Sequence, residues 1–198
     1  MTKLLIAVPT FENIAPETFK SIYDLEKIPG WNFDFQFVKG YDCTVARNKI
    51  AKMAIDQGYD YVLMVDSDII LPSDTVVRFQ ELDQDIILGY YPRKDGKGFA
   101  DIYRSGIGYH DDNRVSMEDL RTASVNRLSI KGGGFGCAFI KTSVFNELKF
   151  PYFSYVTYPD SAMLSEDLYF CTTARNRGFD IFVDARVRCR HIGRKIYE

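Results

Sequence analysis

Two aspartates separated by a single residue are the first candidates for chemistry in this sequence. Asp66 and Asp68, with Ser67 between them, directly follow the apolar run at residues 61–65. Side chains alternate faces along an extended chain, so both carboxylates can point the same way. Such a pair suits a hard divalent cation that bridges to a phosphate-bearing substrate. The alternative is structural, because the same residues could form an Asx turn or cap a helix before Pro72.

A second pair of carboxylates lies in the last quarter of the chain. Glu166 and Asp167 follow Ser165, a favoured N-cap residue, so we expect both in the first turn of a helix. Carboxylates at this position can simply offset the positive end of the helix dipole. On such a rigid platform, a carboxylate could instead be a general base that deprotonates an acceptor hydroxyl attacking a sugar carbon.

His191, one of two histidines, ends an alternating stretch that begins at Arg186. If this stretch is a strand, three arginines line one face, and Val187, Cys189 and His191 line the other. A neutral imidazole there is a candidate third metal ligand, and a mixed carboxylate and imidazole site favours Mn²⁺ over Mg²⁺. The histidine could equally be structural. The arginines could form a solvated edge, or attract a pyrophosphate or an anionic acceptor.

A glycine-rich run at residues 132–136 precedes an expected strand at residues 137–140. A P-loop and a dinucleotide-binding fingerprint both need a helix after the glycines, so neither is present here. The run could be a flexible turn. It could also be a bare backbone edge that lets a ligand such as a sugar ring approach closely.

Basic residues accompany two of the expected strand ends. Arg47 is expected in the first turn of a helix, and Arg93 and Lys94 follow Pro92. Each could be an ordinary surface charge. Each could also face a nucleotide, because ligands of open α/β sheets bind outside the carboxyl ends of the strands.

The elements that must position these residues alternate between strand and helix in the first half of the chain. This alternation predicts βαβ units and a mainly parallel sheet. We expect strands at residues 4–8, 33–37, 61–65 and 86–88, and helices at residues 16–27, 45–57 and from about residue 74.

The second half of the chain is less regular. The stretch 93–113 is rich in glycine and charge and predicts a long loop, of a kind that often serves as a lid. We expect a short strand within it at residues 99–103, a helix at residues 166–177, and further strands at residues 137–140, 181–183 and 186–191.

Composition narrows the class of protein. With 198 residues, 46% of them hydrophobic, we expect one domain over residues 1–198 with a substantial core. A net charge of -2 gives no general reason to expect a polyanionic partner. No apolar run approaches the roughly 20 residues of a membrane span, and the run at residues 4–8 is too short for a signal-peptide core. Scattered cysteines are typical of reduced packing residues, so we expect a soluble cytoplasmic protein.

Taken in order, these motifs resemble the family 2-like glycosyltransferases of the GT-A fold, over nearly the whole chain. The resemblance implies an α/β fold with a Rossmann-like, mainly parallel central sheet flanked by helices, and a small antiparallel C-terminal part. The matching pieces are Val8-Pro9-Thr10, Ala46-Arg47-Asn48, Asp66-Ser67-Asp68, Gly133-Gly134-Phe135-Gly136, Glu166-Asp167 and His191.

The resemblance also implies a role for each residue. A nucleotide-sugar donor, such as a UDP- or GDP-sugar, would be held through Mn²⁺ or Mg²⁺. Asp68 would ligate the metal, Asp66 would contact the metal or the ribose, and His191 would complete the metal shell. Asp167 would be the base of an inverting transfer, and Glu166 would help to hold the acceptor or the donor sugar. The expected nucleotide-sugar-binding set is Val8, Pro9, Thr10, Asp42, Arg47, Asp66, Ser67, Arg93, Lys94, Gly133, Gly134 and Phe135.

One departure from the family pattern concerns recognition of the base. The D-D-x-S stretch common after the second strand of these enzymes is replaced by Lys39-Gly40-Tyr41-Asp42, where Asp42 is the candidate substitute. The acceptor stays open between protein, glycan, lipid-linked sugar and modified nucleic acid, and the arginines make an anionic acceptor worth testing.

Two other functions remain possible from the sequence. A sugar-phosphate nucleotidyltransferase would carry a glycine-rich basic loop after the first strand, where this chain has residues 9–13 as Pro-Thr-Phe-Glu-Asn. A non-catalytic nucleotide- or carbohydrate-binding module is the other alternative.

Overall fold

The structure is a computed structural model of the chain. It describes residues 1–40, 42–105, 113–159, 163–193 and 196–197, and only the backbone of the last two. Tyr41, and most of the second half of the expected loop at residues 93–113, lie outside the described residues.

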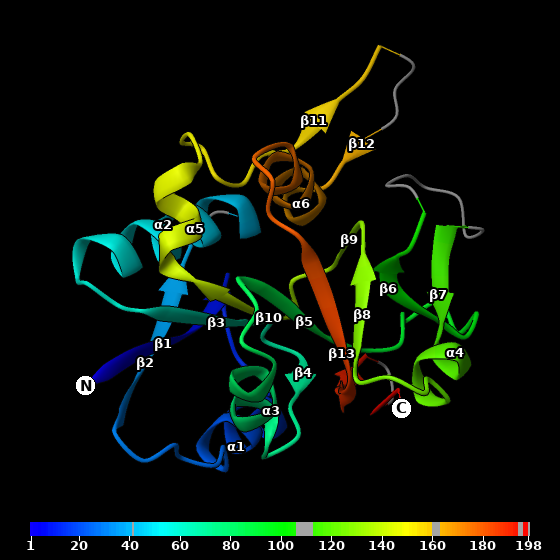
Figure 1. Cartoon of the computed structure of the whole chain (residues 1–198), viewed down its shortest axis with the longest axis horizontal. Coiled ribbons are helices and arrows are strands. Elements are labelled where there is room, and N and C mark those ends of the chain that lie inside the picture. The colour runs from blue at the N-terminus through cyan, green and yellow to red at the C-terminus, as the bar shows by residue number, and fades with distance from the viewer. Residues whose placement is uncertain (41, 106–112, 160–162, 194–195, 198) are drawn as a thin grey trace.

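A seven-stranded sheet in the order β2-β1-β3-β10-β5-β13-β8 forms the centre of the molecule (Figure 1). β1 pairs in parallel with β2 and β3, and β13 pairs in parallel with β5. β10 is antiparallel to β3 and β5, and β8 is antiparallel to β13. The mostly parallel α/β sheet expected from the sequence is therefore confirmed. The strands are β1 (Thr2–Thr10), β2 (Trp31–Lys39), β3 (Tyr61–Val65), β5 (Ile86–Tyr90), β8 (Arg127–Ile130), β10 (Cys137–Lys141) and β13 (Ile181–Arg188).

Helices cover both faces of this sheet. In Figure 1, α2, α5 and α6 lie above the sheet and α1 and α3 lie below it. One hydrophobic core includes Ile50 of α2 and Phe170 of α6, and a second includes Ile22 of α1 and Phe79 of α3. The helices are α1 (Pro16–Tyr23), α2 (Cys43–Asp56), α3 (Thr75–Leu82), α4 (Met117–Arg121), α5 (Thr142–Glu147) and α6 (Glu166–Asn176).

β1 shows why the central strands read as unbroken apolar runs. Leu5 and Ala7 belong to the first core, whereas Leu4, Ile6 and Val8 belong to the second. A strand with helices on both faces must be apolar on both faces, because its side chains alternate between them. The same reason accounts for the run that precedes Asp66.

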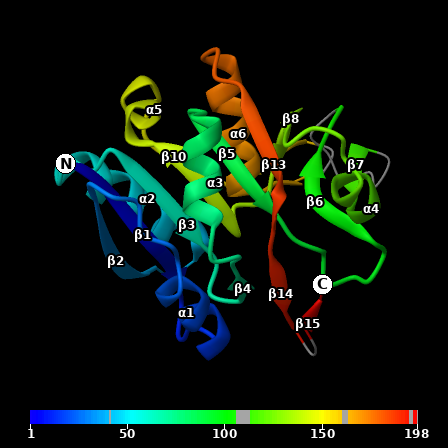
Figure 2. The same ribbon diagram turned by 60° about the horizontal axis from the view of Figure 1, so that its bottom comes forward.

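Three small sheets lie around the central one. β6, β7 and β9 form an antiparallel sheet, β4, β14 and β15 form a second, and β11 and β12 form a hairpin next to α6. Figure 2 shows β13 leading into β14, which leaves the central sheet. The strands are β4 (Ile69–Ile70), β6 (Phe99–Tyr103), β7 (Arg114–Ser116), β9 (Gly132–Gly133), β11 (Val156–Thr157), β12 (Met163–Leu164), β14 (Arg190–Ile192) and β15 (Ile196–Tyr197).

Several expected boundaries differ from the structure. The strands expected at residues 181–183 and 186–191 are instead one strand that ends at Arg188 and a second that starts at Arg190. The first helix ends at Tyr23 rather than near Lys27, before its Pro-Gly stop signal. No helix among the described residues is long and apolar enough to cross a membrane.

Candidate active site

The carboxyl end of β3 and the start of β10 meet at one edge of the central sheet. Antiparallel pairing places Val65 opposite Cys137. The next residues then meet, and the Asp66 N–H donates a hydrogen bond to the Gly136 carbonyl at 3.1 Å. The pairing of two core strands therefore fixes the aspartate pair beside the glycine-rich run.

Arg47 lies at the centre of this edge and is 2% exposed. Its Nη2 donates to Asp66 Oδ1 at 2.8 Å, and its Nη1 donates to Glu166 Oε1. The two carboxylates raise the pKa of Arg47 despite the opposing effect of burial. This burial excludes the alternative that Arg47 is an ordinary surface charge.

Glu166 is buried at the first position of α6, with only 5% of its surface exposed. Burial raises the pKa of the Glu166 carboxyl, although Arg47 acts in the opposite direction. Burial and a hydrogen bond with Glu166 together raise the pKa of Tyr155. Glu166 is thus held between a guanidinium and a phenol.

Asp167 is the next residue of α6, and its environment differs from that of Glu166. Its Oδ1 accepts hydrogen bonds from the Ser165 hydroxyl and, at 2.8 Å, from the Leu168 N–H. Among the described residues, no donor hydrogen-bonds to Oδ2. One oxygen of Asp167 is therefore oriented by the helix start, while the other can receive a proton.

Asp68 and His191 meet at the same edge. His191 Nε2 lies 3.6 Å from Asp68 Oδ1, and Lys94 Nζ lies 2.5 Å from Asp68 Oδ2. Burial raises the pKa of the Asp68 carboxyl, but the neighbouring His191 and Lys94 side chains lower it by a larger amount, so the net shift is downward. A backbone hydrogen bond holds β14 next to the aspartate pair, because the Ile192 N–H donates to the Asp68 carbonyl at 2.8 Å.

The His191 ring is oriented by the chain between β5 and β6. Its Nδ1 lies 3.0 Å from the Pro92 carbonyl, and its ring packs edge-on against Tyr91 with centroids 5.1 Å apart. If the ring proton is on Nδ1, it forms a hydrogen bond with the Pro92 carbonyl, and the lone pair of Nε2 faces Asp68. This is the usual second contact of a metal-binding histidine.

The arrangement fits a metal held by two protein ligands rather than three. Among the described residues, no group of three His, Cys, Asp or Glu side chains is close enough to hold an ion. Asp66 turns instead toward Arg47, and Asp68 and His191 form a pair. Mg²⁺ and similar ions are commonly bound by one or two carboxylates plus substrate phosphates, so this pair suits a cation that a diphosphate completes.

The glycine-rich run is shaped by Tyr91, a residue that the sequence analysis did not select. The Gly136 N–H donates to the Tyr91 hydroxyl at 3.1 Å. A Cβ added to Gly136 would lie 2.7 Å from the Tyr91 ring, and one added to Gly134 would collide with the hydroxyl. These two glycines therefore make room for a tyrosine of the chain itself. The signal available in the sequence was the aromatic pair Tyr90-Tyr91 at the end of an expected strand.

The other residues of the expected nucleotide-sugar set are placed in three ways. Phe135 is completely buried and packs against Phe153 and Phe170, and the Arg47 guanidinium lies over its ring, 5.9 Å from the centroid. Asp42 caps α2, with its Oδ1 accepting from the Val45 N–H at 2.8 Å. The remaining residues stand at the same edge, namely Val8, Pro9 and Thr10 at the end of β1, Ser67 between the aspartates, Gly133 in β9, and Arg93 just after β5.

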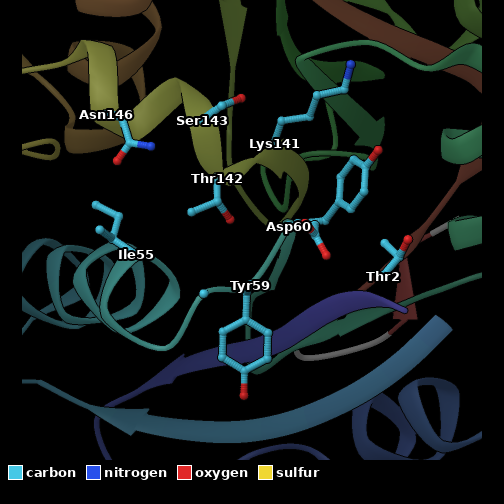
Figure 3. Close-up of a pocket in the computed structure, with 10 residues that line it drawn as sticks. Thr2, Ile55, Tyr59, Asp60, Lys141, Thr142, Ser143 and Asn146 are labelled. Atoms are coloured by element: carbon cyan, nitrogen blue, oxygen red, sulfur yellow. The ribbon is translucent and has the colours of Figure 1, made fainter.

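A hollow of about 450 Å³ lies at the opposite edge of the sheet (Figure 3). It is lined by Thr2 at the start of β1 and Tyr61 at the start of β3, together with Thr142 and Ser143 of α5. Because these strands run away from it, the hollow is separated from Asp66 and Asp68 by the length of the sheet.

No family model and no curated protein matches this sequence. Among solved structures, A197 from STIV superposes with a TM-score of 0.66 at 17% identity, covering 100% of this chain and 93% of that chain. GalNAc-T7, crystallised with UDP, GalNAc and Mn²⁺, gives 0.64 at 12% identity and 98% coverage. TarS of S. aureus, residues 1–349, gives 0.52 at 15% identity and 94% coverage.

The chain spans 60% of the TarS structure and 44% of the GalNAc-T7 structure. Both of these neighbours are glycosyltransferases. Their likeness to this chain lies in the α/β architecture, with the mostly parallel sheet and its flanking helices. The protein therefore has a GT-A-like glycosyltransferase fold.

Proposed function

We propose that this protein transfers a sugar from a UDP- or GDP-sugar to an acceptor hydroxyl, with inversion at the sugar carbon. The observation that carries the proposal is the meeting of Asp66, Asp68, Glu166 and His191 at one sheet edge through a few direct contacts. The structure of GalNAc-T7 with UDP, GalNAc and Mn²⁺ supports a nucleotide-sugar donor for a chain of this fold.

In this proposal, Asp68 and His191 would hold Mn²⁺ or Mg²⁺. When bound, the ion would neutralise the charge that develops on the leaving diphosphate. Lys94 would give up its contact with Asp68 and face the phosphates instead, and Arg93 lies one residue away along the chain. Two cationic side chains at the leaving group stabilise its charge in a partly desolvated site.

Asp167 is proposed as the general base. Its Oδ1 is anchored by the Ser165 hydroxyl and the Leu168 N–H. Oδ2 would accept the proton of the attacking acceptor hydroxyl, while the sugar carbon loses its bond to the diphosphate oxygen. A positioned base of this kind typically contributes 10²–10⁴-fold to the rate.

Arg47 and Glu166 are proposed to position the reacting groups. The Arg47 guanidinium ties the start of α6 to Asp66. These ion pairs would hold Asp167, the proposed base at the start of α6, at a constant distance from Asp66 on the nucleotide side of the site. A displacement of about 1 Å between such groups can cost 10²-fold in rate.

The finer features of the donor and the location are part of the same proposal. Val8, Pro9, Thr10, Asp42 and Ser67 would line the nucleotide pocket. The four cysteines are free thiols, and three of them are buried, which suits the proposed cytoplasmic location.

Hydrolysis of a panel of UDP- and GDP-sugars with Mn²⁺ tests the proposal. We expect slow release of free sugar by the unmodified protein. Asp68→Asn and Asp167→Asn should each lower the rate at least about 100-fold, the lower end expected for loss of a charged catalytic group. Asp56→Asn is the matched control, because this exposed carboxylate at the far end of α2 pairs with Lys52 and with no other described residue.

Other outcomes would point elsewhere. Pyrophosphate release from UTP and a sugar phosphate would identify a nucleotidyltransferase. Nucleotide binding without turnover, unchanged by Asp167→Asn, would identify a non-catalytic binding module. Absence of both binding and turnover across the whole panel would reject the proposal.

A further inference from the structure

Asp101 lies in the candidate active site, although nothing in the sequence motifs selects it. It is in β6, whose neighbours are β7 and β9. The Asp101 carbonyl accepts a hydrogen bond from the Gly134 N–H at 2.8 Å. This bond places the Asp101 side chain against the glycine-rich run and beside Tyr91.

The glycine at position 134 is shaped around this carboxylate as well as around the Tyr91 hydroxyl. A Cβ added to Gly134 would lie 2.6 Å from Asp101 Oδ2. Any side chain there would push the carboxylate away or cover it. The glycine therefore keeps Asp101 Oδ2 uncovered on the side of the run.

The hydrogen-bonding capacity of the Asp101 carboxyl group is only partly satisfied by its neighbours. Arg93 Nη1 and Arg114 Nε each lie 3.7 Å from its Oδ1, which is too far for a direct hydrogen bond. Among the described residues, no donor hydrogen-bonds to the Asp101 carboxylate. Its side chain is 31% exposed, so the carboxylate is accessible to a ligand that supplies donors.

The Asp101 carboxyl interacts electrostatically with that of the proposed base, Asp167. Burial and the Asp167 carboxylate raise the pKa of Asp101, although Arg93, Arg114 and His191 act in the opposite direction. Burial and the carboxylates of Asp101 and Asp167 also raise the pKa of Tyr91. A carboxylate kept in so unfavourable a setting inside a site marks a functional candidate.

We propose that Asp101 determines donor specificity by accepting hydrogen bonds from hydroxyl groups of the sugar. This inference rests on the proposed function. A carboxylate accepts hydrogen bonds only, so it suits neutral hydroxyl donors and repels the diphosphate. Asp101 therefore belongs to the sugar part of the site, and Lys94 and Arg93 to the phosphate part.

This role predicts discrimination between sugars that differ in one hydroxyl. An epimer that turns its hydroxyl away would leave the Asp101 carboxylate desolvated and without a donor. A site built to pair with a hydroxyl rejects an analogue that lacks it much more strongly than a hydrophobic pocket rejects an extra group.

Calorimetric titration of Asp101→Asn tests the inference. The ligands are UDP, GDP and a panel of epimeric UDP- and GDP-sugars, each with Mn²⁺. We expect the affinity for the preferred sugar donor to fall about 10- to 100-fold, the factor expected for a hydrogen bond to a charged group. Affinity for the nucleotide diphosphate should not change, and that result also shows that the variant is folded.

The matched control is Asp95→Asn. Asp95 also pairs with Arg93, at 2.8 Å from Nε, but lies in the turn before β6. We expect its preference among epimers to equal that of the unmodified protein. If Asp95→Asn changes the preference as much as Asp101→Asn does, the effect belongs to Arg93 and the inference is wrong.

Two results separate the inference from the function on which it rests. If the unmodified protein prefers one sugar donor and Asp101→Asn keeps the same affinities and preference, the inference fails alone. If the unmodified protein neither binds nor hydrolyses any nucleotide sugar of the panel, the proposed function fails, and the inference with it.

Discussion

At the scale of single residues, Arg47 joins two carboxylates that come from distant parts of the chain. It is 2% exposed, and its Nε has no hydrogen-bond partner among the described residues. Burying a guanidinium is costly unless carboxylates compensate it, and Asp66 and Glu166 do so here. The three side chains therefore form one ion-pair network, and loss of any one charge leaves another without its partner.

Arg47→Met should destabilise the fold strongly. The change leaves the carboxylates of Asp66 and Glu166 next to an apolar side chain, at an expected cost of about 3–5 kcal/mol in the free energy of unfolding. Urea denaturation measures this cost. Lys52→Met is the control on the same helix, because Lys52 is exposed and should change the stability by less than about 0.5 kcal/mol.

A loss of less than about 1 kcal/mol for Arg47→Met would contradict this account. It would mean that Asp66 and Glu166 are solvated or protonated without Arg47. Glu166→Gln should then also be nearly neutral, since its carboxylate would not depend on the guanidinium.

At the scale of elements, the glycine-rich run and the strand β5 are built for each other. β5 leads to Tyr91, whose ring is nearly completely buried and whose hydroxyl accepts from the Gly136 N–H. The ring fills the space that side chains at positions 134 and 136 would need. The glycine-rich run is thus a packing surface for Tyr91 as well as a proposed neighbour of the donor sugar.

Gly136→Ala should destabilise the fold by about 1–3 kcal/mol, the usual cost of overpacking a core. Tyr91→Leu removes the ring atoms that the new methyl group would meet. A double-mutant cycle by urea denaturation should therefore show coupling of about 0.5–3 kcal/mol between the two positions, with the double variant less destabilised than the sum. Additive effects would show that the glycine is needed for a reason other than Tyr91.

The sequence predicted the long elements better than the short ones. β1, β3, β5 and β10 lie where unbroken apolar runs were found, because burial on both faces leaves that pattern. β4, β9, β11 and β12 are two residues long and have no periodicity to detect. Such short strands exist only because another segment pairs with them.

At the scale of the whole molecule, the site is the place where the two halves of the chain meet. The first half supplies Asp66, Asp68 and Arg47, and the second half supplies Glu166 and His191. A ligand that contacts both halves binds only the folded chain, and so it stabilises the fold by mass action.

A UDP- or GDP-sugar with Mn²⁺ should therefore raise the melting temperature. At a concentration 100 times the Kd, the gain is about 2.7 kcal/mol, or roughly 5–10 °C for a chain of this size. Mn²⁺ alone should give a much smaller shift, because Asp68 and His191 offer only two ligands. The measurement is a thermal-shift series with each component alone and both together.

Asp68→Asn serves as the control in this series, and it should remove the part of the shift that depends on the metal. A full shift with Mn²⁺ alone would contradict the two-ligand account. It would show that the protein completes the metal shell without a diphosphate.

By itself, the sequence determined the class of fold and the local position of most candidate residues. Burial on two faces dictated the apolar runs, and a charged pair at the end of such a run had to lie at a strand end. Ser165 before Glu166 and Asp167 placed both carboxylates at a helix start. These are local consequences of period and capping, which a sequence carries directly.

Only the tertiary structure decided which of these residues meet. It turned Asp66 toward Arg47 and left Asp68 to pair with His191, and it brought Asp101 to the glycine-rich run. Contacts of this kind depend on strand order and register across the sheet. Those are set by packing between distant segments, and no local pattern in a single sequence encodes them.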